Sequence, residues 1–353
     1  MLSRVNKLEA ALAQTDCDAV LVTNLKNIYY LTSFSGTEAT VFISKNRRIF
    51  LTDSRYTLIA KGVVKGFDII ETRDALGEIA KIIGDDKLEK IGFDDQVSYA
   101  YFEMLKSVFA AYELIAMSSF IENLRMIKDA EEIDTIRKAC QISDQAFLDV
   151  LDFIKPGETT ELAVMNFLDA RMRKLGASGA SFDFIIASGY RSAMPHGVAS
   201  EKVIQTGETL TMDFGCYYNH YVSDMTRTIH VGHVTDEERE IYDIVLRANK
   251  ALIDQAKAGV SRIDFDRIPR QIINDAGYGA YFTHGIGHGI GLDIHEIPYF
   301  GKSSEPIEIG MVLTDEPGIY LDGKYGVRIE DDLVITETGC EVLTLAPKEL
   351  IVI

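Results

Sequence analysis

The segments TLTMDFGC (209–216) and YVSDMTRTIHV (221–231) decide the fold of the C-terminal part of the chain. Both alternate apolar with polar residues, which predicts two neighbouring β-strands. Asp213 and Asp224 lie in these strands among strongly apolar neighbours. If the connecting turn centres on 218–219, the two aspartates lie directly opposite each other, with β-carbons about 4.5–5.5 Å apart. Carboxylates that close repel each other unless a cation lies between them, so the pair predicts a metal site.

A glycine-rich stretch, FTHGIGHGIGLDIHE (282–296), contains three of the seven histidines of the chain. The spacing of His284 and His288 occurs in helical zinc sites, but glycine alternates with larger residues here. Period two predicts an extended segment, and a face of bare glycines lets another backbone or a ligand approach closely. We expect His288 to bind a metal and His284 and His295 to face a substrate.

Two glutamates in later strands extend this set. Glu316 precedes a Pro-Gly turn in TDEPGIY (314–320), and Glu330 lies in GVRIEDDLVI (326–335). Arg328 shares a strand face with Glu330, so it can orient that carboxylate.

Neighbouring aspartates are rivals for the same role. Asp315 points away from the strand face of Glu316, and Asp331 points away from that of Glu330. Asp332 shares the face of Glu330 and stays an alternative ligand. Four carboxylates and one imidazole are more than one small cation needs, so they predict two divalent ions that activate a water for hydrolysis. Oxygen-rich ligands favour Mn²⁺, with Co²⁺, Fe²⁺ or Zn²⁺ as alternatives. The predicted ligands are Asp213, Asp224, His288, Glu316 and Glu330.

Length and composition narrow the class of protein. The 353 residues favour two domains, and the formal net charge of -18 argues against binding nucleic acid or anionic membranes. No segment approaches the ~18 apolar residues of a membrane span, and the N-terminus lacks a signal-peptide pattern, so we expect a soluble cytoplasmic protein. Neither a disulfide framework nor a thiolate zinc site is expected from the four widely spaced cysteines, Cys17, Cys140, Cys216 and Cys340.

The first third of the chain alternates β-rich and helical segments, which predicts an α/β domain over residues 1–122. Strands are expected at 19–24, 28–34, 40–45, 48–53, 68–72 and 90–95. Helices are expected at 2–15, 54–62, 74–84 and 98–111.

Residues 123–353 mix helices with mostly antiparallel strands, which predicts an α+β catalytic domain. Asp129 is the expected N-cap of a long amphipathic helix that stops near 155–157. Further helices are expected at 160–175, 236–257 and 263–276. Strands are expected at 182–187, 209–215, 222–231, 282–293, 311–320 and 326–335.

Six short stretches of this C-terminal region together resemble the pita-bread metallopeptidases, and among them the Xaa-Pro peptidases aminopeptidase P and prolidase. They are MPHGVAS, TLTMDFG, SDMTRTIHVG, HGIGHGIGLDIHE, EPGIY and GVRIEDD. The resemblance covers essentially all of 123–353, and the preceding α/β domain matches the smaller creatinase-like domain of these enzymes. Methionine aminopeptidases share the pita-bread core but are normally much shorter, so the length of this chain argues against that branch.

The resemblance implies how the ligands are shared between the two ions. Asp213 and Asp224 would bind one ion, and Asp224 would bridge to the second. His288 and Glu316 would bind the second ion, and Glu330 would bridge both.

Catalytic and substrate-binding roles are also implied by the resemblance. Glu316 would accept a proton, while His196 and His295 would stabilise the tetrahedral intermediate or protonate the leaving nitrogen. Arg328 would hold the ligands in place, and an aromatic wall would contact the proline. The residues expected around the substrate are His284, Arg328, Phe182 and Tyr320.

The expected function is removal of the N-terminal residue before proline from short peptides. The Xaa-Pro bond is a tertiary amide without an N–H, so it suits a dedicated site. Prolidase activity on dipeptides is a close alternative. A catalytically inactive peptide- or protein-binding module and a metal-free hydrolase of creatinase type are further alternatives. The resemblance also implies a homodimer.

Overall fold

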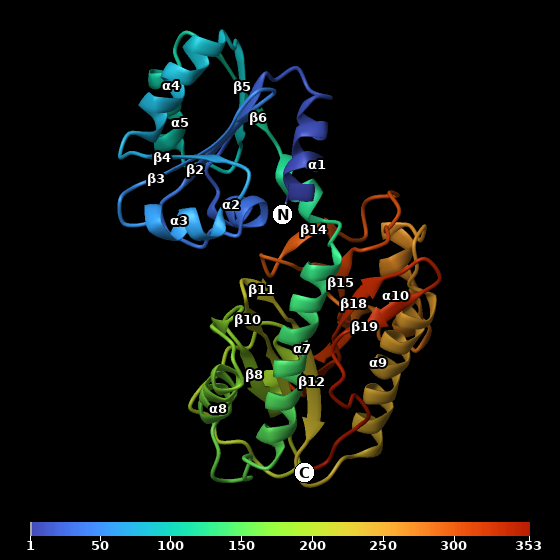
Figure 1. Cartoon of the computed structure of the whole chain (residues 1–353). Coiled ribbons are helices and arrows are strands. Elements are labelled where there is room, and N and C mark those ends of the chain that lie inside the picture. Colours follow the sequence, from blue (N-terminus) through green and yellow to red (C-terminus); the bar gives the residue numbers. More distant parts are fainter. Residues whose placement is uncertain (1) are drawn as a thin grey trace. The chain divides into compact units, whose positions relative to one another are not determined.

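The computed structural model describes residues 2–353 and contains two compact units, one ending at Arg125 and the other spanning Met126–Ile353. Figure 1 shows the helices and strands of each unit with their labels. Among residues 2–353, no helix is long and apolar enough to cross a membrane.

The N-terminal unit is built on one six-stranded sheet with the strand order β4-β3-β2-β1-β5-β6. Pairs β1–β5, β3–β4 and β5–β6 are parallel, while β1–β2 and β2–β3 are antiparallel. The strands are β1 (Ala19–Val22), β2 (Thr40–Ser44), β3 (Arg48–Thr52), β4 (Asp68–Glu71), β5 (Lys90–Asp94) and β6 (Glu113–Met117). The helices are α1 (Leu2–Leu12), α2 (Leu25–Thr32), α3 (Thr57–Val63), α4 (Ala75–Asp86), α5 (Tyr99–Val108) and α6 (Phe120–Arg125). The predicted α/β class of this region is confirmed.

The strand predicted over 28–34 is wrong, because most of this segment belongs to helix α2. Asn24 caps the helix, since its side chain accepts two backbone N–H groups of the first turn. Ile28 and Leu31 then lie on the buried face at helical spacing. The β propensity of isoleucine and tyrosine is overridden here by the cap and by burial of this face.

The C-terminal unit has four long helices, and in the part of the chain described its named strands pair with one another only antiparallel. An isolated parallel bridge joins His230 to Val352. The predicted N-cap is confirmed: Asp129 and Glu132 form a capping box at the start of α7 (Ala130–Leu151). The other long helices are α8 (Glu161–Lys174), α9 (Asp236–Gln255) and α10 (Arg262–Asp275), and they confirm the three helices predicted after α7. The short 3-10 helices are η1 (Gly189–Ala193) and η2 (Gly279–Tyr281).

The strands of this unit form four sheets. Their orders are β11-β10-β7, β12-β9-β8, β14-β13-β15-β18-β19 and β16-β17. The first strands are β7 (Gly179–Ala180), β8 (Ile185–Ser188), β9 (Thr209–Phe214), β10 (Cys216–Tyr218), β11 (Tyr221–Val222) and β12 (Met225–His230). The later strands are β13 (His288–Gly289), β14 (Glu296–Tyr299), β15 (Val312–Asp315), β16 (Gly318–Leu321), β17 (Tyr325–Arg328), β18 (Asp331–Ile335) and β19 (Cys340–Val342).

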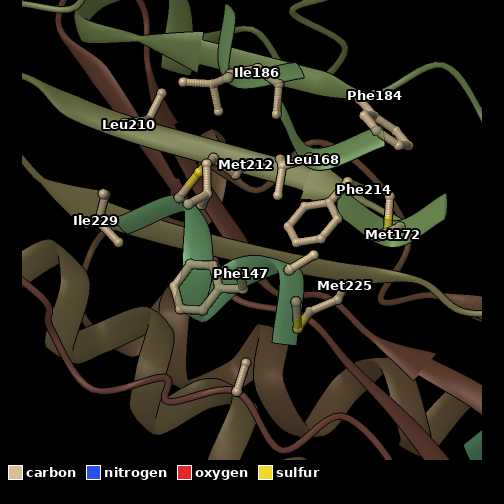
Figure 2. Close-up of a cluster of buried hydrophobic side chains, with 14 of the residues drawn as sticks. Phe147, Leu168, Met172, Phe184, Ile186, Leu210, Met212, Phe214, Met225 and Ile229 are labelled. Atoms are coloured by element: carbon tan, nitrogen blue, oxygen red, sulfur yellow. The ribbon is translucent and has the colours of Figure 1, made fainter. Parts of the chain in front are cut away.

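A hydrophobic core beside strand β9 determines which way its polar residues face. Figure 2 shows Leu210, Met212 and Phe214 of this strand in one cluster with Phe147 of α7 and Leu168 of α8. Because side chains alternate along a strand, the odd-numbered residues of β9 lie on the other face. The core therefore directs the carboxylate of residue 213 away from the helices.

The predicted register between Asp213 and Asp224 is wrong. Asp213 pairs with Thr226, because the tight turn lies one residue later than expected. Its two central residues, Asn219 and His220, have φ of 45° and 70°, which suits the type I′ turn that joins twisted strands. Both aspartates still share one sheet face, but they are diagonal neighbours.

The continuous extended segment predicted over 282–293 is also wrong, because β13 is the one strand that the described residues of this range form. Gly287 and Gly289 allow close approach of another backbone, as predicted, whereas a Cβ on Gly285 would meet no described residue beyond its chain neighbours. A Cβ on Gly287 would lie 2.4 Å from the carbonyl oxygen of Thr314, and one on Gly289 would lie 2.5 Å from that of Ile297. The register between β13 and β14 shifts between His288 and Gly289, and the backbone bends over 291–295.

Candidate metal centre

The five predicted ligands line a single cavity of about 560 Å³ in the C-terminal unit. They come from separate strands or strand ends: β9, the residue before β12, β13, the turn after β15 and the residue before β18. Residues more than a hundred positions apart therefore meet at one site. The ligands are Asp213, Asp224, His288, Glu316 and Glu330.

Three of the five form a close group. Asp224, His288 and Glu330 each offer one oxygen or nitrogen atom, and these atoms lie within 4.8 Å of one another. Glu316 joins them, because its Oε1 lies 3.7 Å from Nε2 of His288, the same distance that separates this nitrogen from Oδ2 of Asp224.

Asp213 is the fifth predicted ligand, and it contacts the buried Arg328. Its Oδ2 accepts a hydrogen bond of 2.5 Å from Nη2 of Arg328. Its Oδ1 is buried and has no hydrogen-bond partner among the described residues. A buried carboxylate oxygen without a partner is costly, and a cation would satisfy it.

Burial and mutual repulsion disfavour the ionised form of the carboxyl groups in the absence of a cation. Burial, followed by the charges of neighbouring carboxylates, raises the pKa of Asp224 and of Glu330 well above the usual range. Burial raises the pKa of Glu316 to about 7. A divalent cation would reverse this unfavourable balance, so the residues present fit a metal centre.

Arg328 and Thr226 connect Asp213 and Glu330 by hydrogen bonds. We expected Arg328 to orient Glu330, but its guanidinium bonds directly to Asp213 and reaches Glu330 only through Thr226. Its Nε donates to Oγ1 of Thr226 at 3.0 Å, and this hydroxyl donates to Oε2 of Glu330 at 2.6 Å. Sequence reasoning gave Thr226 no role, although its alternation placed it on the face of Asp224.

The hydrogen bonds of the histidines fix their tautomers. His288 directs Nδ1 at the carbonyl oxygen of Gly289 at 3.2 Å, so Nε2 keeps its lone pair toward the carboxylates. Burial lowers the pKa of His288 and of His284 to about 4, so both are neutral near pH 7.

His284 is bound on both sides of its ring. Nδ1 lies 2.8 Å from the carbonyl oxygen of Gly285, and Nε2 lies 2.7 Å from the hydroxyl of Tyr320. This hydroxyl accepts from Nη1 of Arg328 at 2.9 Å, so it donates to His284. Tyr320 is buried and is not among the residues that line the cavity.

We expect Tyr320→Phe to leave Arg328 and His284 each short of one hydrogen bond. The free energy of unfolding should fall by about 1–3 kcal/mol, the cost of buried polar groups that lose a partner. Chemical denaturation of the two proteins measures this difference. Equal unfolding free energies would show that the hydroxyl does not hold the two side chains.

The other candidate residues lie on the more exposed side of the cavity. His196 and His295 are exposed, and Phe182 is half-buried beside Phe184. The ring of His295 is inclined by 69° to that of His288, with 4.4 Å between centroids. The cavity thus has carboxylates at its base and histidines and aromatic rings on its walls.

Behind the two glutamates lies a buried polar network that sequence reasoning did not find. Asp331 follows Glu330 and is fully buried; its Oδ1 accepts from Nη2 of Arg227 at 2.8 Å. Its Oδ2 accepts from Nζ of Lys348 at 2.6 Å and from Asn249 at 3.0 Å. These partners lie far from Asp331 in the sequence or outside its strand, so no local sequence pattern predicts them.

This network makes a prediction about acid stability. Although burial alone would raise it, Arg227 and Lys348 lower the pKa of Asp331 to about 2, against roughly 3.9 in an unfolded chain. A carboxyl group whose pKa is lower in the folded than in the unfolded chain stabilises the fold at pH values above the unfolded pKa. This stabilisation is lost as the pH falls through the folded pKa of about 2. The difference in unfolding free energy between the wild-type chain and Asp331→Asn should therefore shrink between pH 5 and pH 2. A difference independent of pH would contradict this assignment.

Comparison with known proteins decides the family. The model of metallopeptidase family M24 matches residues 134–337, and that of the creatinase/prolidase N-terminal domain matches residues 4–127. This chain belongs to metallopeptidase family M24. Its N-terminal unit is the creatinase-type domain, and its C-terminal unit is the pita-bread catalytic domain, as the sequence predicted.

Solved structures and a curated relative agree over the full length of this metallopeptidase. An Xaa-Pro dipeptidase from Bacillus anthracis is 44% identical, with a TM-score of 0.97 over 100% of this chain and 99% of that one. An X-Pro aminopeptidase from Thermotoga maritima MSB8 is 39% identical, with a TM-score of 0.91 over 98% and 100% of the two chains. The Xaa-Pro dipeptidase of Pyrococcus furiosus is 38% identical over 99% of this chain and 100% of its own.

Proposed function

We propose that this metallopeptidase hydrolyses the Xaa-Pro bond of short peptides with a centre of two divalent metal ions. The observation that carries the proposal is the buried group of four carboxylates and one imidazole at the base of a walled cavity. The relatives named above as Xaa-Pro dipeptidase and X-Pro aminopeptidase support the substrate class. Oxygen-rich ligands make Mn²⁺ the first metal to test.

Five side chains would hold the ions: Asp213, Asp224, His288, Glu316 and Glu330. When bound, the ions would supply a polarised substrate carbonyl and an activated water. Glu316 would accept the proton of the attacking water, because its carboxylate lines the cavity beside the other ligands, with Oε1 3.7 Å from Nε2 of His288. His196 and His295 would donate hydrogen bonds to the oxygen that gains charge, or a proton to the leaving proline nitrogen.

Apolar side chains on the cavity wall suit a proline ring. Phe182, Ile185, Val198 and Phe300 line the cavity beside the histidines. A prolyl amide has no N–H to satisfy, so such a wall can pack on the ring without a hydrogen-bond acceptor for the scissile nitrogen.

Two substrate lengths are supported by different observations. The dipeptidases from Bacillus anthracis and Pyrococcus furiosus favour a dipeptide. The cavity favours a longer peptide, because Arg328 is its single permanently cationic lining residue within 2–353. That guanidinium already bonds to Asp213, Thr226 and Tyr320, so it is not free to bind a terminal carboxylate.

Hydrolysis of Ala-Pro and Ala-Pro-Ala by the Mn²⁺-loaded chain tests the proposal, with Ala-Ala as the control peptide. Cleavage of Ala-Pro alone would identify a dipeptidase, and preference for Ala-Pro-Ala would identify an aminopeptidase. Cleavage of neither proline peptide, or equal cleavage of Ala-Ala, would contradict the proposed specificity.

A further inference from the structure

The glutamate that follows His295 in the segment DIHE has no role in the function proposed above. Glu296 is buried, and its Oε2 lies 3.2 Å from Nζ of Lys128. The two side chains are only 6% and 1% exposed. Two charges taken out of water are unfavourable unless the geometry compensates them, so the position of this pair is informative.

The same carboxylate closes the loop that carries His295. Its Oε1 accepts from the backbone N–H of Leu292 at 2.8 Å and from that of Asp293 at 3.0 Å. A Cβ on Gly291 would lie 2.7 Å from Oε2, so the backbone wraps closely around the carboxylate. Hydrogen bonds to an ionised acceptor are stronger than neutral ones, and these two define the path of residues 291–295.

The loop is anchored at both of its ends. Gly289 pairs with Glu296 where strands β13 and β14 meet, and Val222 donates its N–H to the carbonyl oxygen of Gly291 at 2.9 Å. Lys128 belongs to the segment before α7, and its own N–H donates to the carbonyl oxygen of Gly310 at 2.9 Å. Figure 1 shows β14 and the start of α7 within the same unit.

We propose that Lys128 and Glu296 are a positioning pair that fixes His295 against His288 in the cavity. The inference rests on the proposed function, because that function gives His295 its role. Lys128 holds the carboxylate, the carboxylate holds the loop, and the loop places the imidazole. Neither Lys128 nor Glu296 lines the cavity, so neither is expected to touch the substrate.

Kinetics of a double-mutant cycle test the pair, with Ala-Pro as the substrate and Mn²⁺ as the metal. Glu296→Gln should lower kcat about 10–100-fold with little change in KM, the scale of a catalytic group displaced by about 1 Å. In the His295→Ala background the same substitution should cost less than about twofold, because the group that it positions is gone. Metal content should stay at the wild-type value in every variant.

A matched control exists elsewhere in the catalytic unit. Glu208 also pairs with a lysine, Lys202, at 2.6 Å and also accepts a backbone N–H, from Gln205 at 2.9 Å. It does not line the cavity, so Glu208→Gln should leave kcat unchanged. If Glu296→Gln does not fold, Glu296→Asp keeps the charge and withdraws the carboxylate by one methylene; we expect it to lower kcat likewise.

A second readout does not depend on activity. In nuclear magnetic resonance spectra of the Zn²⁺-saturated, histidine-labelled full chain, Glu296→Gln should shift the ring signals of His295, assigned with His295→Ala. The signals of the buried His230 should stay in place. If Glu296→Gln lowered kcat equally in the wild-type and the His295→Ala chains, or left the His295 signals unshifted, the positioning role would be overturned. A wild-type chain that cleaves no Xaa-Pro peptide would refute the proposed function, while the spectra would still test the placement of His295.

Discussion

Replacing Asp224 with asparagine should abolish turnover and the pairing of metal ions. Asp224 is nearly fully buried, and its carboxylate lies within reach of both His288 and Glu330. An amide offers one neutral oxygen where the carboxylate offers two charged ones. Carbonyl polarisation and water activation are each worth several kcal/mol, so kcat for Ala-Pro should fall at least about a thousandfold. Metal content by mass spectrometry should fall below that of the wild-type chain.

His196→Ala is the matched control for this loss. His196 lines the same cavity but is exposed and lies outside the carboxylate group. Its variant should keep the metal content of the wild-type chain and lose about 10²–10⁴-fold in kcat, the usual contribution of a proton donor or acceptor. An Asp224→Asn chain with full metal content and activity would refute the metal assignment. Full activity of His196→Ala would refute only the role of that histidine.

Replacing Arg227 with methionine should destabilise the catalytic unit by about 3–5 kcal/mol, the usual cost of removing one partner of a buried ion pair. Arg227 is 1% exposed, and all of its donor nitrogens are engaged. Its guanidinium donates to Asp331 and to the backbone carbonyls of Glu330 and Ala346. Without it, Asp331 keeps Lys348, Asn249 and Thr344 but loses its fully buried cationic partner.

Chemical denaturation of Arg227→Met beside a surface control measures this effect. Lys250→Met removes half of an ion pair whose side chains are 49% and 70% exposed, so it should change the unfolding free energy by less than about 1 kcal/mol. Because Arg227 also holds the backbone of Glu330, its variant should bind Mn²⁺ more weakly than the control. Equal stability of the two variants would show that the buried pair does not hold the strands together.

Local patterns predicted the elements of the site better than their pairing. Alternation placed Asp213 on the face away from the apolar core, and the structure agrees because Met212 and Phe214 pack on α7 and α8. The register was wrong by one turn position, because a two-residue turn at Asn219 and His220 competes with a turn one residue earlier and composition alone does not separate them.

Other features depend on contacts that the sequence does not display. Strand β6, over Glu113–Met117, was not predicted, because two of its five residues are exposed and its apolar pattern is weak. The pair of Lys128 and Glu296 joins residues 168 positions apart, and Arg227 and Asp331 are 104 apart. Tertiary folding brings these charges together, whereas strand alternation reports only on neighbours in the chain.

The central claim is a centre of two metal ions, and native mass spectrometry of the Mn²⁺-saturated full chain tests it most directly. The carboxylate group and the unpartnered oxygen of Asp213 predict a mass that exceeds the metal-free chain by two manganese ions. A chain that takes up one ion or none at saturating Mn²⁺, Co²⁺, Fe²⁺ and Zn²⁺ would contradict the account.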